Sequence, residues 1–237
     1  MFISKELLTV GCASFGLTLD GAAIDRFDAY ARLLVNYNEK VNLTAITAPD
    51  EIVNKHFVDS LYLAKFVDLR DGMKLCDVGT GAGFPGAALL TAFPTLRVTL
   101  FDSVNKKLEF LRLLVKELEL TADIVTMRVE DAGKNPAYRE TFDVVTARAV
   151  AQLNVLSEFC VPLVRTGGVF APMKAPLSEE ERRRGVGAAA NLGAKLEQDE
   201  PYTIPDGSER EVLIFRKKIA TAGKYPRPFA QISKKPL

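Results

Sequence analysis

Apolar residues recur at helical spacing through the first seventy positions of the chain. One set lies at steps of three and four residues and comprises Ile24, Phe27, Ala31 and Leu34. A second helix begins at Pro49-Asp50, and its apolar stripe comprises Val53, Phe57, Leu61 and Ala64. Each set lies on one face of its helix, so both helices are predicted to pack against the rest of the protein.

The segment between these helices, residues 36–44, is polar and rich in amide side chains. Such a composition is typical of turns rather than of a core segment. We predict that it forms a lip over a substrate. Together with the two helices it makes an N-terminal helical extension over residues 1–70.

After residue 70 the pattern changes to short apolar runs that alternate with helical stripes. Strands are predicted at 74–78, 97–101, 124–129, 142–147 and 169–173, and helices at 104–118, 152–164 and 178–192. Alternation of this kind is typical of an α/β protein with a doubly wound, Rossmann-like parallel sheet. Ligands bind such sheets at the carboxyl ends of the strands.

Two further strands end this α/β part of the chain. They are predicted at 195–204 and 211–217, and Pro205-Asp206-Gly207 between them is a strong turn signal. Strands joined by a turn close the sheet with an antiparallel edge and an antiparallel terminal strand. Dehydrogenase sheets more often continue in parallel, so this ending favours a methyltransferase domain, expected over residues 71–218.

A glycine-rich loop, Asp77 to Gly86, follows the first strand and opens a helix. A Cβ at Gly79, Gly81 or Gly83 would occupy space that a ligand could use. Their G-x-G-x-G spacing matches S-adenosylmethionine enzymes. Gly81, Gly83 and Gly86 also match the dinucleotide pattern, so spacing alone leaves the cofactor class open.

Charged residues stand at the ends of the predicted strands: Asp77, Asp102, Glu130, Arg148 and Lys174. Because parallel strands bring their carboxyl ends to one edge, these side chains are expected to converge on one crevice. Asp102 ends the second strand, where a carboxylate accepts hydrogen bonds from ribose hydroxyls in either cofactor class. It is the leading candidate for ribose binding.

Composition narrows the class of protein. Hydrophobic residues make up 48% and charged residues 26% of the 237 positions, as in ordinary globular proteins. No apolar run is long enough for a signal peptide or membrane span, so a cytoplasmic protein without membrane contact is expected. Cys12, Cys76 and Cys160 are odd in number and far apart, which supports neither a disulfide framework nor a metal site.

The net charge of +1 conceals a cationic C-terminus. Residues 210–237 hold eight Lys and Arg side chains against one acidic residue, Glu211, and aromatic and proline residues interleave with the charges. A charge run alone is usually a solvated surface. The interleaving favours an extended basic tail, residues 219–237, that contacts a phosphate backbone.

Six short segments, taken together, resemble one family over nearly the whole chain. The segments are residues 42–47, 56–61, 77–86, 102–107, 146–149 and 224–227. In their order and combination they are similar to the bacterial 16S rRNA guanine-N7 methyltransferases, also called glucose-inhibited division protein B. The chain departs from the family pattern at Tyr37, Thr80 and Ala175, where tryptophan, serine and glycine are common.

This resemblance implies S-adenosylmethionine as cofactor and 16S rRNA or the small ribosomal subunit as partner. The implied cofactor residues are Asp77, Gly79, Gly81, Gly83, Phe84, Asp102, Val129, Glu130 and Arg148, with Asp102 at the ribose and Val129-Glu130 at the adenine. Arg148 stands at the mouth of the site, and Arg148 and Lys174 are the candidate catalytic residues. Lys174, Lys224 and Arg227 are implied on the RNA side, and a monomer is expected.

The acceptor chemistry fits the side chains that are present. Guanine N7 carries a lone pair and no proton, so methyl transfer to it needs no general base, and His56 is expected to be a hydrogen-bonded structural residue. Arg148 could donate to guanine O6, to a phosphate or to the cofactor. Two alternatives stay open: an NAD-dependent oxidoreductase, although no Tyr-x-x-x-Lys pair follows the loop, and a non-catalytic RNA- or ribosome-binding module.

Overall fold

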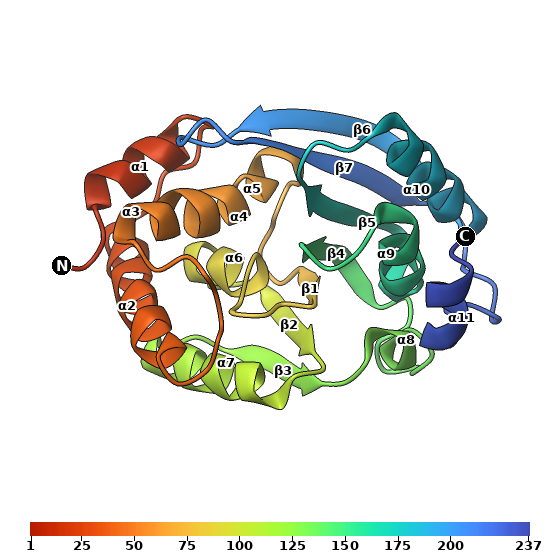
Figure 1. The fold of residues 1–237 in the computed structure, drawn as a ribbon, viewed down its shortest axis with the longest axis horizontal. Helices are drawn as coiled ribbons and strands as arrows, with labels where there is room; N and C mark the ends of the chain where they lie inside the picture. The colour runs from red at the N-terminus through yellow and green to blue at the C-terminus, as the bar shows by residue number, and fades with distance from the viewer.

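The computed structural model describes all 237 residues and contains one mixed sheet between two layers of helices (Figure 1). The strands are β1 (Lys74–Val78), β2 (Arg97–Asp102), β3 (Ala122–Thr126), β4 (Phe142–Arg148), β5 (Val164–Lys174), β6 (Ala194–Thr203) and β7 (Glu209–Lys217). Their order across the sheet is β3-β2-β1-β4-β5-β7-β6. The predicted α/β architecture is confirmed.

The helices alternate with these strands after an N-terminal helical segment. They are α1 (Lys5–Ala13), α2 (Gly21–Asn38), α3 (Pro49–Glu51), the π-helix η1 (Ile52–Val58), α4 (Asp59–Leu61), α5 (Leu63–Phe66), α6 (Gly86–Ala92), α7 (Asn105–Glu117), α8 (Val129–Ala132), α9 (Leu153–Cys160), the 3-10 helix η2 (Val161–Leu163), α10 (Glu179–Asn191) and α11 (Phe229–Lys234). The π-helical turn is an element that helical spacing does not reveal, and such turns recur at functional sites.

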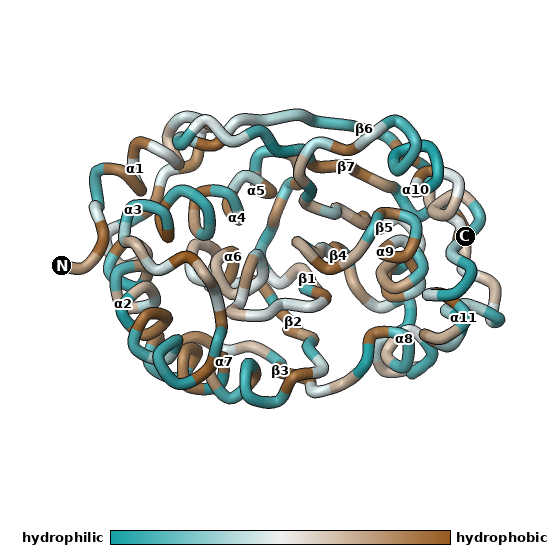
Figure 2. The backbone as a smooth tube through the Cα atoms, in the orientation of Figure 1, coloured by the Kyte–Doolittle hydropathy of each residue, from teal (hydrophilic) through white to brown (hydrophobic).

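The two faces of the sheet carry separate apolar cores. One core packs α1, α2, α6 and α7 with the N-terminal segment against side chains such as Leu75 and Val144. The other packs α9, α10 and α11 against the alternate side chains, such as Cys76 and Val145. Figure 2 shows the apolar β-strands enclosed between helices with polar outer surfaces. Neighbouring strand residues enter different cores because successive side chains of a strand point to opposite faces of the sheet.

The N-terminal helices are part of the first core. Phe27, Phe57 and Leu61 are fully buried, as the apolar stripes predicted. Tyr30, outside the predicted stripe, is also buried, and its hydroxyl donates to the Ala82 carbonyl at 2.6 Å. The N-terminal segment therefore lies against the glycine-rich loop. The expected division into parts at residues 70 and 218 stays a prediction.

The predicted end of the third strand is wrong. The strand expected over 124–129 ends at Thr126, where its pairing partner Asp102 ends β2, and Val129 and Glu130 begin α8 instead. The acidic side chains of α8 lie in its first turn, where they complement the helix dipole. The adenine-side residues therefore come from a helix, not from a strand end.

The end of the sheet also differs in one respect from the predicted arrangement. The strand β7 is antiparallel, as predicted, but it pairs with both β5 and β6 and is therefore internal. The edge strand is β6, which runs parallel to β5 because both are antiparallel to β7. No helix of the structure has the length and apolarity that a membrane span requires.

Candidate functional site

The glycine-rich loop is held in a conformation that only glycine adopts easily. Gly79, Gly81 and Gly83 all have positive φ, at 69°, 58° and 99°. A Cβ on Gly79 would lie 2.6 Å from Val150 Cγ2, whereas one on Gly81 would approach only the Gly79 carbonyl oxygen, at 3.9 Å. A Cβ on Gly83 would overlap the Tyr30 hydroxyl inside the protein. Of the three, Gly81 faces open space, and for Gly79 the expectation that a glycine makes room for a ligand stays a prediction. For Gly83 the expectation is wrong, because the Tyr30 hydroxyl occupies that space.

Asp77 lies beneath this loop rather than on its surface. It is fully buried, and one carboxylate oxygen accepts the Gly86 N–H at 2.8 Å while the other has no hydrogen-bond partner. Burial raises the pKa of Asp77 to about 6, against the opposing effects of the hydrogen bonds and of the Arg148 charge. The side chain fixes the start of α6, and its expected role in cofactor binding stays a prediction.

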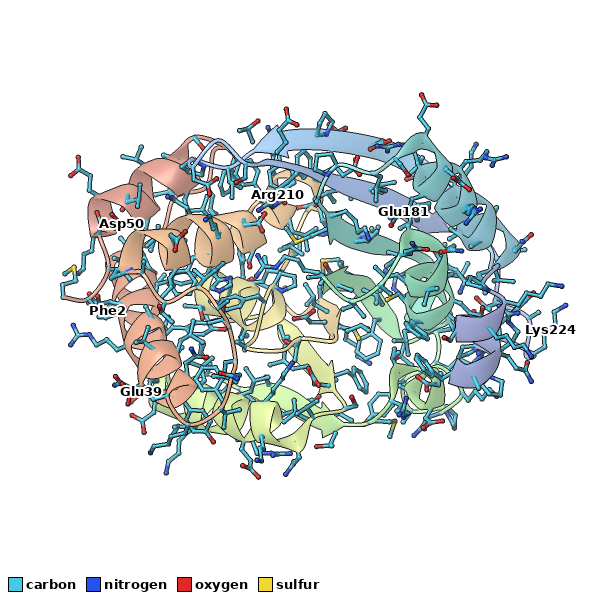
Figure 3. All side chains as sticks on the ribbon, in the orientation of Figure 1. Phe2, Glu39, Asp50, Glu181, Arg210 and Lys224 are labelled. Atoms are coloured by element: carbon cyan, nitrogen blue, oxygen red, sulfur yellow. The ribbon has the colours of Figure 1, made fainter.

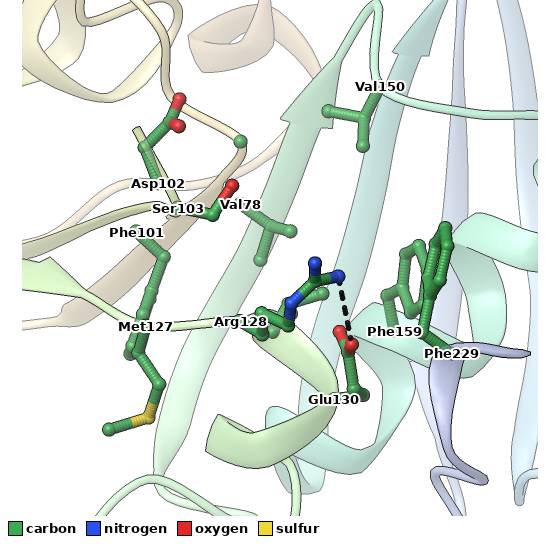
Figure 4. A pocket seen from close by; sticks show the side chains of 12 residues that line it. Val78, Phe101, Asp102, Ser103, Met127, Arg128, Glu130, Val150, Phe159 and Phe229 are labelled. Carbon is green, nitrogen blue, oxygen red and sulfur yellow. Dashed lines mark ion pairs between the residues drawn. The ribbon is translucent and has the colours of Figure 1, made fainter. Parts of the chain in front are cut away.

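Asp102 lies at the floor of a small pocket of about 160 Å³ beside the loop (Figure 4). Its carboxylate accepts the N–H groups of Gly81 at 3.1 Å and Val104 at 2.9 Å. These bonds fix the carboxylate at the end of β2 and leave lone pairs for further donors. The pocket is smaller than typical ligand sites of ~300–1,000 Å³, so a nucleoside cofactor would extend out of it along the loop.

The opposite side of this pocket comes from α8 and the C-terminal tail. Val129 and Glu130 line it, and Arg128 pairs with Glu130 at 3.6 Å. Phe229 of α11 stacks on Phe159 at 6.3 Å between ring centroids, and the Arg128 guanidinium lies over Phe229 (Figure 4). A carboxylate on one side and aromatic rings on the other are suited to a ribose joined to a flat base. We name this cavity the nucleoside pocket.

A larger pocket of about 530 Å³ lies beyond the end of β4. We name it the acceptor pocket. Its lining comprises Ile46, Lys55, His56, Asp59, Arg148, Ala149, Met173, Lys174, Ala175, Pro176, Leu177, Glu181, Tyr202 and Arg210. Figure 3 shows Glu181 on α10 and Arg210 on β7, elements far from the glycine-rich loop in sequence.

Arg148 is held rigidly at the inner wall of the acceptor pocket. Its guanidinium donates to Asp59 Oδ2 at 2.7 Å and to the Lys55 carbonyl at 3.0 Å. Asp59 is buried and also accepts from the Tyr202 hydroxyl at 2.8 Å. Arg148 does not line the nucleoside pocket, so it borders the acceptor side of the site.

His56, on the π-helix, is locked as a neutral imidazole. Burial and the neighbouring Arg148 charge lower the pKa of His56 to about 3. The Arg148 guanidinium can only donate, so the Nδ1 atom, 3.4 Å away, is the acceptor and Nε2 donates to Thr44 Oγ1 at 2.9 Å. The expected structural role of His56 agrees with this geometry. Thr44 brings the predicted 36–44 lip to the acceptor pocket, although its first three residues belong to α2.

Phe84 lies between aromatic side chains rather than in a pocket. Its ring stacks on Tyr30 and on His56, with centroids 5.4 and 4.3 Å away, and Arg148 lies over it at 5.3 Å. The ring is only 6% exposed. Phe84 therefore connects the glycine-rich loop to the wall of the acceptor pocket without lining either cavity.

Three consecutive residues at the end of β4 line the two pockets. Arg148 and Ala149 line the acceptor pocket, and Val150 lines the nucleoside pocket. Ala149 has φ 58°, a left-handed conformation that costs a non-glycine residue about 1–3 kcal/mol. This strained turn directs neighbouring residues into opposite cavities, so a molecule in each would face the other across it.

Sequence reasoning found part of this site. The structure brings Gly79, Asp102, Val129 and Glu130 to the nucleoside pocket, and Arg148 and Lys174 to the acceptor pocket. Sequence reasoning missed other lining residues of both pockets. In the nucleoside pocket these are Ser103, Arg128, Val150, Phe159 and Phe229, and in the acceptor pocket they are Asp59, Glu181, Tyr202 and Arg210. Asp59 and Ser103 had a signal, because they lie in the segments 56–61 and 102–107.

The basic tail is folded rather than extended. Arg227 forms an ion pair with the fully buried Glu158 at 2.6 Å, and Lys217, which precedes the tail, is buried against the Val161 carbonyl. The Arg227 guanidinium therefore neutralises an internal carboxylate, and its expected place on the RNA side stays a prediction. Lys224 remains exposed, and its Nζ lies over the Tyr225 ring.

Comparison with known proteins supports a methyltransferase. A family model described as rRNA small subunit methyltransferase G matches residues 23–200. Proteins named ribosomal RNA small subunit methyltransferase G are similar to the chain, at 44% identity over 227 residues in Bacillus velezensis (95% of both chains) and at 47% over 216 residues in Lactobacillus acidophilus (90% of both chains).

Solved structures share the fold at low sequence identity. An S-adenosylmethionine-dependent O-methyltransferase from Thermotoga maritima covers 80% of this chain and 73% of its own, with TM-score 0.54 and 14% identity. TrmN from Thermus thermophilus covers 68% of this chain and 48% of its own, with TM-score 0.54 and 21% identity. The predicted Rossmann-like methyltransferase fold is confirmed.

Proposed function

The chain belongs to the rRNA small subunit methyltransferase G family, and from this premise we propose that it transfers a methyl group from S-adenosylmethionine to N7 of a guanine in 16S rRNA. The observation that carries the proposal is the pair of pockets that the consecutive residues Arg148-Ala149-Val150 line. A cofactor in the nucleoside pocket and a base in the acceptor pocket would face each other there.

The nucleoside pocket fits the cofactor by its chemistry. Asp102 would accept hydrogen bonds from the ribose hydroxyls, and Phe229 and Val129 would contact the adenine. When bound, S-adenosylmethionine supplies an electrophilic methyl group on a sulfonium. The open space above Gly81 would take the part of the cofactor that extends out of the pocket.

The protein's own task is to position the acceptor base and exclude water. Positioning and orientation can supply about 7–11 kcal/mol of the barrier reduction. His56 is neutral and already hydrogen-bonded on both ring nitrogens, which suits a reaction that requires no proton transfer to a side chain. Arg148 and Lys174 present donors to the base from fixed positions, Arg148 being held by Asp59.

The base would enter from a single-stranded RNA segment. Side chains cannot reach guanine N7 in the narrow major groove of an A-form helix, so the nucleotide must be unstacked and turned outward. Lys55 and Arg210 lie at the acceptor pocket together with Lys174, and these cations would contact the flanking phosphates. We expect a cytoplasmic enzyme that acts as a monomer.

Neither alternative from the sequence is favoured. Relatives that match over most of the chain are named as methyltransferases, which gives no support to an oxidoreductase. A non-catalytic RNA-binding module would have no use for a nucleoside pocket that adjoins the acceptor pocket.

Methyl transfer to small ribosomal subunits that lack the modification tests the proposal. The expected product is 7-methylguanine in 16S rRNA, formed only with S-adenosylmethionine present. Transfer to another atom or to no RNA would overturn it.

A further inference from the structure

Glu181 enters the acceptor pocket from a charge run that resembles a solvated helix in the sequence. Ser178 caps α10 and accepts the Glu181 N–H at 3.2 Å. In a capping box the glutamate at this position returns to the cap residue's own N–H. Here the Glu181 carboxylate turns away, accepts the Leu153 N–H at 2.9 Å and forms an ion pair with the Lys174 Nζ at 2.9 Å.

Close packing of α10 against α9 fixes this arrangement. Gly185 lies one turn after Glu181, and a Cβ on it would overlap the side chain of Leu153, the first residue of α9. Arg182 anchors the start of α10 to β7 through Glu211, at 2.5 Å. Both contacts hold Glu181 at the end of β5, beside Lys174.

The pair keeps unused hydrogen-bonding capacity toward the pocket. Both contacts of Glu181 use Oε1, which leaves Oε2 without a partner in the chain. Lys174 donates to the Ala151 carbonyl at 2.8 Å and pairs with Glu181, and its ammonium, which has three N–H donors, keeps a donor for a further acceptor. The other pocket carboxylate, Asp59, is 4% exposed and already accepts from Arg148 and Tyr202.

A fixed acceptor beside a fixed donor matches guanine and not adenine. The Watson–Crick edge of guanine presents two neighbouring donors, N1–H and the N2 amino group, next to the O6 acceptor. Adenine presents an acceptor, N1, where guanine presents N1–H, and an amino group in place of O6. A carboxylate and an ammonium would therefore meet like groups on adenine.

We propose that Glu181 and Lys174 form the guanine-reading pair of the acceptor pocket, with the Glu181 carboxylate accepting from N1–H and the N2 amino group and Lys174 donating to O6. This inference rests on the proposed function and adds the specificity-determining residue. Because O6 and N7 are neighbours on the guanine ring, a donor that holds O6 also orients N7.

If Glu181 only capped α9 and did not contact the base, substitutions at this position would have a different effect from the one that the guanine-reading pair predicts. Glu181→Gln keeps an oxygen that can accept the Leu153 N–H but removes the charge that binds the donors of guanine. Glu180→Gln is the matched control, because Glu180 lies next to it on α10 and pairs only with Arg184 on the exposed face. We expect both variants to unfold at the wild-type temperature.

The decisive experiment measures single-turnover methyl transfer to small subunits reconstituted with 16S rRNA that carries guanosine or inosine at the target. Inosine keeps N1–H, O6 and N7 but lacks the N2 amino group. Wild-type protein and Glu180→Gln should methylate inosine at least about tenfold more slowly, the effect of one lost hydrogen bond to a charged group. Glu181→Gln should methylate guanosine at least about tenfold more slowly and discriminate little between the two bases.

Equal wild-type rates on guanosine and inosine would overturn the inference without any variant. An unchanged discrimination ratio in Glu181→Gln would also overturn it and leave the proposed function intact. If the wild-type protein transferred no methyl group to the guanosine subunits, the proposed function itself would be wrong.

Discussion

At the scale of single residues, Asp102 combines a structural and a binding role. Its carboxylate holds the Gly81 and Val104 N–H groups and faces the nucleoside pocket. We expect Asp102→Ala to weaken S-adenosylmethionine binding about tenfold to a hundredfold, because hydrogen bonds to a charged acceptor contribute about 1.5–3 kcal/mol. Calorimetric titration measures this.

The matched control for Asp102→Ala is Asp123→Ala, on the neighbouring strand β3, where the side chain is exposed and away from both pockets. It should bind the cofactor as the wild type does. Unaltered affinity in Asp102→Ala would remove Asp102 from the ribose role.

His56 gives a residue-scale prediction on pH. Burial and Arg148 lower the pKa of His56 from 6.5 to about 3 in the folded protein, so the unfolded chain binds a proton more readily. Its neutral form therefore stabilises the fold above pH 6.5, and this stabilisation is lost as the pH falls toward 3. Between pH 7 and pH 5 the loss is about 2 kcal/mol.

The raised pKa of Asp77, about 6, acts in the opposite direction over part of this range, so the wild-type profile alone does not isolate His56. We therefore expect the difference in unfolding free energy between wild type and His56→Gln to shrink by about 2 kcal/mol from pH 7 to pH 5. Urea unfolding at both pH values measures it. A difference that stays constant with pH would contradict the assigned environment of His56.

Which residues the sequence could reveal depends on how locally their environment is determined. Gly81 and Asp102 belong to one βαβ unit, so their neighbourhood follows from the two strands and the loop that carry them. Glu181 resembles its exposed neighbour Glu180 in sequence, and only the packing of Gly185 on α9 separates their roles. Residues positioned by such contacts carry no local signal.

At the scale of elements, the C-terminal tail completes the nucleoside pocket. The Arg227–Glu158 ion pair fixes the start of α11, and Phe229 then stacks on Phe159 beside Arg128. A tail that sequence composition suggests is an RNA-binding arm is therefore also a wall of the nucleoside pocket.

Phe229→Ala should weaken cofactor binding about tenfold, because a stacked aromatic surface contributes about 0.5–1.5 kcal/mol beyond its buried area. Lys234→Ala, on the same helix and exposed, should leave cofactor affinity unchanged. Equal affinities in all three proteins would show that α11 does not contact the cofactor.

The elements themselves were predictable where the apolar pattern has clear limits. The strand β1 matches its predicted bounds, and β2 differs only by including Asp102, because glycine and charged residues delimit both runs. The predicted end of β3 is wrong because apolar residues continue through Val129, while the end of the strand is set by pairing with Asp102. Pairing partners are not visible in a single strand's sequence.

At the scale of the whole molecule, RNA affinity should depend on the cations that remain exposed. Lys224 is exposed, unlike Lys217 and Arg227, which have internal partners. If Lys224 contacts one phosphate, Lys224→Ala should reduce the slope of log affinity against log salt by about 0.7–0.9. Filter binding of 16S rRNA across a salt series measures the slope.

Arg70→Ala is the control for this experiment. Arg70 is exposed and precedes β1, so it lies at the N-terminal ends of the parallel strands, whereas the two pockets lie at their carboxyl ends. It should leave the slope unchanged. The tail would have no phosphate contact at Lys224 if both variants kept the wild-type slope.

The measurement that tests the central claim most directly is identification of the methylated atom after incubation of the protein with S-adenosylmethionine and unmodified small ribosomal subunits. Mass spectrometry of nucleosides from the 16S rRNA should show 7-methylguanosine as the product with wild-type protein and a strong loss of it with Asp102→Ala. Methylation at another atom, or none with the wild-type protein, would contradict the assignment of the two pockets to cofactor and guanine.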